Sequence, residues 1–95
     1  MYFSMKDYKL LRFQKSKTKG KKYDAIIQHK KNKDEKRIPF GATGYEQYKD
    51  STGVGLYSHS NHGDKTRRRN YRSRHRHFLK DGQFSPGYFS WKYLW

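Results

Sequence analysis

The stretch Tyr23–His29, which reads YDAIIQH, decides the fold because its aromatic and β-branched residues favour a β-strand. A similar stretch, YKLLRFQ at Tyr8–Gln14, precedes it, and the basic segment KSKTKGKK around Gly20 joins the two as a turn. The polar segment KKNKDEK then leads to RIPF at Arg37–Phe40. These three stretches predict a three-stranded antiparallel meander over residues 1–40.

Pro39 and the lysines of the connecting segments refine this prediction. Proline has no N–H to donate to a neighbouring strand, so the third strand should be an edge strand or end near Pro39. The lysine-rich connections have two interpretations. They bind anions, or they protect the edges of the sheet from unwanted pairing with other chains.

Residues 41–63 form a glycine-rich crossover, for which we expect irregular structure with one helical turn around Tyr45–Lys49. The glycines lack the G-K-[ST] ending of a phosphate-binding P-loop. They also lack the strand-to-helix framing of a dinucleotide-binding fingerprint. We expect them to form turns with positive φ angles instead.

Residues 64–82, which read DKTRRRNYRSRHRHFLKDG, predict a basic helix of about sixteen residues between an N-cap at Asp64 and a C′ residue at Gly82. At about 100° per residue, one narrow face should pack on the domain. It consists of Tyr71, His75, Phe78 and Leu79. A second face, displaced by about 140° from Tyr71, is cationic and should bind a polyanion. It consists of Lys65, Arg69, Arg72, Arg76 and Lys80.

Residues 83–95 form an aromatic tail that includes SPGYFSWKYLW. Within it Tyr88, Trp91 and Trp95 recur at helical spacing, which predicts a short aromatic helix. These rings either pack onto the domain or anchor a partner protein, as tryptophan and tyrosine often do at interfaces. The predicted fold is therefore α+β, in one domain: a small antiparallel meander, an arginine-rich helix and a short aromatic C-terminal helix.

The net charge of +15 on 95 residues is the strongest global feature of the sequence. Residues 1–37 carry thirteen basic and four acidic residues, and residues 65–80 carry eight basic residues and no acid. Leu, Ile, Val and Phe together number only fifteen, so the nine tyrosines and two tryptophans must supply much of the core. Such a charge predicts attraction to nucleic acid, to an anionic membrane surface or to an acidic protein.

Three motifs in a fixed order resemble a family of small, basic, largely uncharacterised proteins of nucleocytoplasmic large DNA viruses. They are FG-x-x-GY, RR-x-YR-x-RH and SPG-x-FSW-x-YLW, and the similarity covers about residues 23–95. The residues that carry it are Phe40, Gly41, Gly44, Tyr45, Tyr48, Arg68, Arg69, Tyr71, Arg74, His75, Ser85, Pro86, Phe89, Ser90, Trp91, Leu94 and Trp95. The resemblance implies a viral origin and a place in the virion, and it supplies no catalytic residues.

Catalytic and metal-binding patterns are weak in this sequence. There is no cysteine, which excludes disulfides and thiolate ligands. His75 and His77 would point about 200° apart on one helix, so they could not join His59 and His62 around one zinc ion. Ser58 and Ser60 are close to His59 in the chain, but no third group or oxyanion hole accompanies them. We expect no enzyme activity, no cofactor, no metal and no small-molecule substrate.

Two functions remain open at this point. The first is binding of nucleic acid, with DNA favoured over RNA, for condensation or packaging of a genome. The second is a minor capsid component wedged between larger, acidic viral structural proteins. No stretch of 18 apolar residues and no secretion signal is evident, so we expect the virion, and the host cytoplasm or nucleus during infection.

Overall fold

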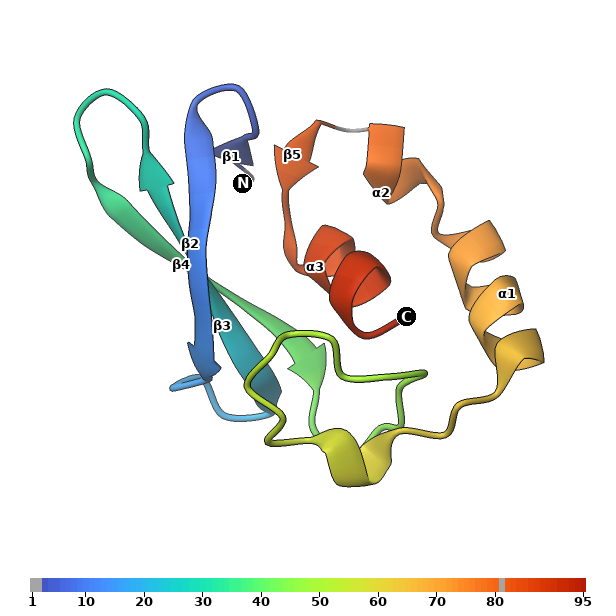
Figure 1. The fold of residues 1–95 in the computed structure, drawn as a ribbon. Helices are drawn as coiled ribbons and strands as arrows, with labels where there is room; N and C mark the ends of the chain where they lie inside the picture. The colour runs from blue at the N-terminus through green and yellow to red at the C-terminus, as the bar shows by residue number, and fades with distance from the viewer. Residues whose placement is uncertain (1–2, 81) are drawn as a thin grey trace.

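The computed structural model describes residues 3–80 and 82–95, with the side chain of Leu79 outside the description. Its elements form three successive layers (Figure 1). A three-stranded sheet lies on one side, helix α3 (Pro86–Tyr93) lies in the middle, and helix α1 (Lys65–Arg74) lies on the far side of α3. The α+β class predicted from the sequence is confirmed.

The sheet consists of β2 (Tyr8–Lys15), β3 (Lys21–His29) and β4 (Glu35–Ala42), in the order β2-β3-β4 with both pairs antiparallel. This is the predicted meander. Strand β4 contains Pro39 and is an edge strand, as expected from the missing N–H. A register shift at Leu10–Arg12 in β2 leaves Leu11 partly exposed.

The core lies between the sheet and α3. Ala25 and Tyr23 of β3 are opposite Ile38 and Phe40 of β4, and all four side chains are buried. Phe89 of α3 is fully buried against them, with its ring centroid 5.5 Å from that of Phe40. Aromatic rings thus fill much of the space that aliphatic side chains fill in most domains.

Helix α3 begins as the sequence dictates. The Ser85 side chain caps it by accepting a hydrogen bond from the N–H of Tyr88, and Pro86 occupies the first turn. A second small sheet positions its start. Strand β1 (Phe3–Ser4) pairs with β5 (Gln83–Phe84), which the sequence analysis did not predict.

The crossover differs from the expectation in one respect. Residues Tyr45–Lys49 form no helical turn, and a single 3₁₀ turn occurs later, at η1 (Ser58–Ser60). The fully buried Gln47 explains the difference, because its amide donates to the Tyr57 carbonyl and to Asn61 Oδ1, each at 2.7 Å. These bonds tie the segment to the later loop in an extended conformation.

The predicted sixteen-residue helix is also wrong in its length. Helix α1 begins after Asp64 as expected, but it ends at Arg74, and a separate turn, α2 (His77–Lys80), follows. The break allows Phe78 to pack on α3, where a Cβ atom at Gly87 would lie only 2.2 Å from Phe78 Cζ. Close packing of α2 on α3 therefore requires glycine at position 87.

Candidate nucleic-acid interface

Helix α1 has an inner face toward α3 and an outer face toward solvent, and none of its residues is fully buried. Its half-buried residues are spaced three, one and three positions apart, which corresponds to one helical face. They are Arg68, Tyr71 and Arg72 in α1, and His75 immediately after it. The inner face is thus half cationic and half aromatic.

Two arginines attach this inner face to the residues that follow α3. The Nε–H groups of Arg68 and Arg72 both donate to the main-chain oxygen of Trp95, at 2.8 and 2.9 Å. The Arg72 guanidinium also lies 4.2 Å from the centroid of the Trp91 ring, whose Nε1–H donates to the Arg72 carbonyl at 3.2 Å. Burial and the neighbouring Arg68 lower the pKa of Arg72.

These contacts correct the prediction for Arg72. Helical spacing predicts Arg72 on the exposed cationic face with Lys65, Arg69, Arg76 and Lys80, whereas it is half-buried against Trp91. The four others are exposed. The physical reason is that a guanidinium can stack on an indole ring while its N–H groups bond to a carbonyl, so arginine can occupy an inner face.

Aromatic rings complete the attachment, as predicted for Tyr71, His75 and Phe78. The Tyr71 ring is stacked on that of Trp95 with centroids 4.3 Å apart and an angle of 9° between the ring planes. The centroid of the His75 ring lies 4.6 Å from that of Tyr71 and 5.9 Å from that of Phe78. Leu79, the fourth residue predicted for this face, lies outside the described side chains.

The proposed partner anchors Tyr88, Trp91 and Trp95 prove to be internal contacts. Tyr88 and Trp91 are each only 8% exposed, and Trp95 is half-buried between Tyr71 and the ring of His62. Their side chains hold the layers of the protein together. Tyr88 and Trp91 are therefore too buried to anchor another protein, whereas Trp95 keeps an exposed part and its role as an anchor stays a prediction.

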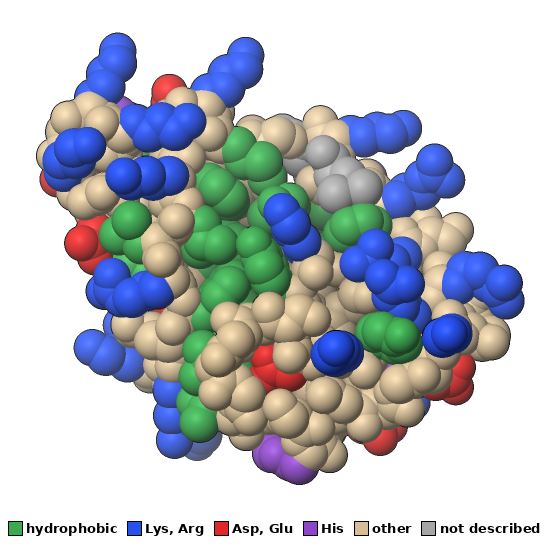
Figure 2. Space-filling view, viewed as in Figure 1, with side chains coloured by type: hydrophobic (Ala, Val, Ile, Leu, Met, Phe, Trp, Pro, Cys, Tyr) green, Lys and Arg blue, Asp and Glu red, His purple; other side chains and the backbone are tan. Residues whose placement is uncertain are grey.

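The outer face of α1 is polar and cationic. Its exposed residues, together with those of the turn and α2 that continue it, are Lys65, Thr66, Arg67, Arg69, Asn70, Ser73, Arg74, Arg76, His77 and Lys80. We call five of these cations, which pair with no carboxylate among the described residues, the outer cationic face: Lys65, Arg69, Arg74, Arg76 and Lys80. Arg74 replaces Arg72 in the predicted set. Figure 2 shows Lys and Arg side chains gathered over α1 and α2.

Few carboxylates neutralise this face. Within residues 3–80 and 82–95, the ion pairs are Arg12–Glu35, Arg37–Asp24 and Arg67–Glu46, and the last of these is the one that involves α1. Asp64 is the acid adjoining the start of the helix. Its carboxylate accepts hydrogen bonds from the N–H groups of Arg67 and Thr66, which lower the Asp64 pKa.

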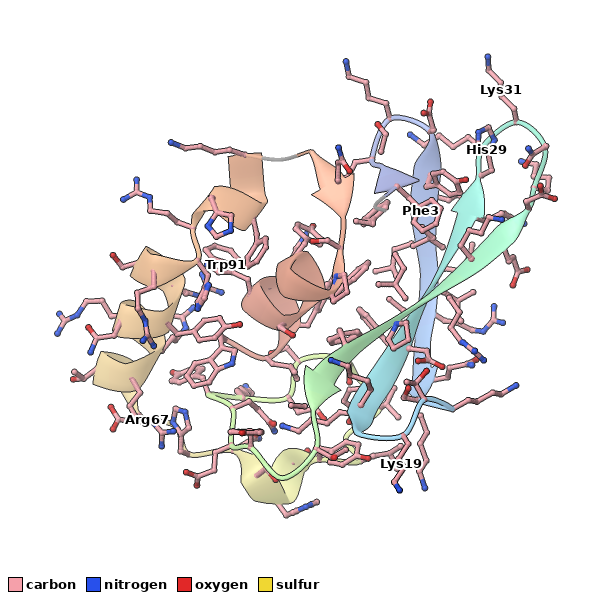
Figure 3. All side chains as sticks on the ribbon, turned by 180° about the vertical axis from the view of Figure 1, so that it is seen from behind. Phe3, Lys19, His29, Lys31, Arg67 and Trp91 are labelled. Atoms are coloured by element: carbon pink, nitrogen blue, oxygen red, sulfur yellow. The ribbon has the colours of Figure 1, made fainter. Side chains whose placement is uncertain are left out.

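Further cations extend from the turns of the sheet. Lys19 lies in the β2–β3 turn and Lys31 in the β3–β4 turn, and both side chains point into solvent, far from Arg67 on α1 (Figure 3). The exception is Lys22 in β3, which is only 2% exposed. Its ammonium donates to the Tyr45 carbonyl at 2.6 Å and to the side-chain oxygen of Gln47. Burial lowers the pKa of Lys22, although nearby Asp50 opposes this.

Two other kinds of feature, a metal site and a membrane-spanning helix, are not found among the described residues. Among them, no group of three or more His, Cys, Asp or Glu side chains is arranged to hold a metal ion. In the same residues, every helix is too short or too polar to cross a membrane. The histidines singled out in the sequence serve as packing partners instead, with His62 beside Tyr48 and Trp95, and His75 beside Tyr71.

Comparison of the chain with models of protein families, with curated proteins and with solved structures finds no match. The resemblance to small basic proteins of large DNA viruses thus stays a prediction based on three short motifs. The geometry and charge of the outer cationic face are the features that bear on function.

Proposed function

We propose that the protein binds nucleic acid, with DNA favoured over RNA, through the outer cationic face of α1 and α2. The observation that supports this most directly is a run of five exposed cations from Lys65 to Lys80 without a carboxylate partner among the described residues. Guanidinium and ammonium groups in this state can replace the counterions that are condensed on nucleic-acid phosphates. The release of those counterions drives association. The net charge of +15 strengthens the attraction at long range.

Phosphate contacts would dominate such a complex. Of the exposed groups, Asn70 and Ser73 are the uncharged side chains best placed to add hydrogen bonds, since they lie between Arg69 and Arg74 on the same face. Contacts to phosphates position a protein without reading sequence, so we expect little sequence preference. This behaviour suits condensation or packaging of a genome in a virion, as the family resemblance implies.

The alternative function, a minor capsid component between acidic neighbours, is less well supported. It was motivated by aromatic residues available to partners. Tyr88 and Trp91 are buried, and Trp95 is occupied by Tyr71 and by the two arginines. A shell protein would have to contact its acidic neighbours through exposed cations rather than through these rings.

The test is the salt dependence of binding to duplex DNA, measured by fluorescence anisotropy. Neutralisation of about five phosphates by the outer cationic face predicts a slope of about −4.5 in a plot of log K against log salt concentration. Binding that does not change with ionic strength, or no binding at low salt, contradicts the proposal.

A pair of charge-matched variants locates the surface. Arg69→Glu/Arg74→Glu changes the outer cationic face, whereas the control Lys19→Glu/Lys31→Glu changes the turns of the sheet and lowers the net charge equally. The first variant should reduce the magnitude of the salt slope by about 2 and weaken binding at least about tenfold at low salt. The control should retain most of the affinity. Equal losses in both variants would show that net charge alone drives binding.

A further inference from the structure

A pocket of about 280 Å³ lies where β4, the crossover, α1 and the end of α3 meet. Its floor contains Gly41 and Leu94, which pack so closely that a Cβ atom at position 41 would lie 2.9 Å from Leu94 Cδ1. Its volume is just below the range of about 300–1,000 Å³ that is usual for drug-sized ligands. The pocket therefore suits a fragment of about the size of one nucleobase.

Aromatic rings form the rim and one wall of this pocket. Tyr45 is 71% exposed, more than any other large hydrophobic side chain that the structure describes, and it lines the pocket. The stacked pair Tyr71–Trp95 forms a wall. An exposed tyrosine beside a pocket is a platform on which a planar base can stack.

The polar groups of the pocket favour a neutral ligand with an acceptor atom. Lys22 has three N–H donors, two of which bond to the Tyr45 carbonyl and to Gln47, so the third can meet an acceptor on a ligand. At the mouth, Arg67 is paired with Glu46 at 3.1 Å. This ion pair offsets the charge of Arg67, so the mouth itself gives a free phosphate little attraction. An uncharged base with carbonyl oxygens fits both observations.

We infer that this pocket accepts an unpaired nucleobase from single-stranded nucleic acid held on the outer cationic face. The inference rests on the proposed function and extends it to one kind of substrate. Arg67 belongs both to the pocket mouth and to α1, so a strand whose phosphates follow the helix can place one base in the pocket. The base stacks on Tyr45 and accepts a hydrogen bond from Lys22.

The experiment compares two labelled single strands of about twelve nucleotides, oligothymidylate and an abasic strand of the same length and charge, by anisotropy. Duplex DNA is measured in parallel. The wild-type protein should bind oligothymidylate about 5- to 150-fold more tightly than the abasic strand, the range that stacking of one base gives. Thymidine monophosphate should quench tryptophan fluorescence, because Trp95 lines the pocket.

Three variants assign the preference to the pocket. Tyr45→Ala should remove it, and Tyr45→Phe should retain it because the ring, not the hydroxyl, stacks. The control Leu56→Ala truncates a side chain that is 48% exposed and lies outside the pocket. It should leave the preference for oligothymidylate unchanged. All three should bind duplex DNA like the wild type, because the Lys22 contact at position 45 uses the main-chain carbonyl.

Several outcomes overturn the inference. Equal affinity of the wild type for the two strands rejects the base pocket while duplex binding upholds the proposed function. Quenching by inorganic phosphate as strong as that by thymidine monophosphate identifies an anion site instead. A Tyr45→Ala variant that keeps the preference shows that the base binds elsewhere. If none of the three nucleic acids binds at low salt, the proposed function and the inference both fail.

Discussion

The central strand and the outer helix of this protein are held in place by different physical means. Six consecutive residues of β3, Lys22–Ile27, are buried, and the strand is paired on both sides. Helix α1 has no buried residue. Its attachment includes two arginine side chains bonded to one carbonyl, one guanidinium–indole contact and a stacked tyrosine–tryptophan pair.

The difference shows how a protein with few aliphatic residues keeps a cationic helix in place. Apolar burial is concentrated in the sheet and α3, where each ring removes a large area from water. The same arginine chemistry that could bind phosphates is used on the inner face of α1 to bind aromatic rings and a carbonyl. The helix therefore carries its charge on both faces, but only the outer face is open to a polyanion.

The largest expected effect on stability comes from the apolar core between the sheet and α3. Phe89→Ala should lower the free energy of unfolding by about 3–5 kcal/mol, because it leaves a cavity among Phe13, Phe40 and Phe84. That is a large part of the stability of a small domain. Urea denaturation measures it, with the exposed Leu56→Ala as a control that should change stability little. Equal effects of the two variants would contradict the assignment of the core.

A smaller effect on stability should follow from Arg72→Ala on the inner face of α1. The loss of the contact with Trp91 and of the bond to Trp95 should cost about 1–3 kcal/mol. Hydrogen exchange should accelerate in the amides of α1 and not in those of β3. Arg72→Lys keeps the charge but loses the planar donor group, so its exchange rates in α1 should lie between those of the wild type and the alanine variant. Uniform acceleration across both elements would show that α1 is not a separate unit.

The smallest effect is expected at the start of α1. Asp64→Ala removes the acceptor for the N–H groups of Arg67 and Thr66 and should reduce the helical circular dichroism signal at neutral pH. Because the pKa of Asp64 is lowered in the folded protein, its stabilising effect is present above the ordinary carboxylate pKa. The effect is lost as the pH falls through the lowered value. The two proteins should therefore converge in acid, and a difference independent of pH would exclude this role of the carboxylate.

The sheet could be predicted from the sequence because its signals are local. Short runs with aromatic and β-branched residues, a glycine turn and a proline on the last strand identified β2, β3 and β4 within a few residues. Pairing of β1 with β5 could not be predicted. It joins Phe3 to Phe84 through two residues on each strand, and no local pattern marks such a distant contact.

The start of the basic helix and its aromatic inner face were predicted, but its length and the place of Arg72 were not. Asp64 was the expected cap, and Tyr71 packs inward as its spacing required. The role of Arg72 depends on Trp91, nineteen residues later, and no rule of periodicity connects an arginine with a distant indole. The break after Arg74 likewise depends on the fit of Phe78 against Gly87, which is visible only in three dimensions. The pocket at Tyr45 was missed because its walls come from five segments: β3, β4, the crossover, α1 and the end of α3.

The middle position of α3 has a consequence for synthesis on the ribosome. The meander is complete once residue 42 has been made, but the helix that covers its apolar face ends at residue 93. At about 5–20 residues per second, Tyr23 and Phe40 stay uncovered for about 3–10 s in each nascent chain. During that interval the exposed lysines of the turns would oppose association of neighbouring nascent chains by charge repulsion. The basic residues of the sheet would then act before the outer cationic face exists.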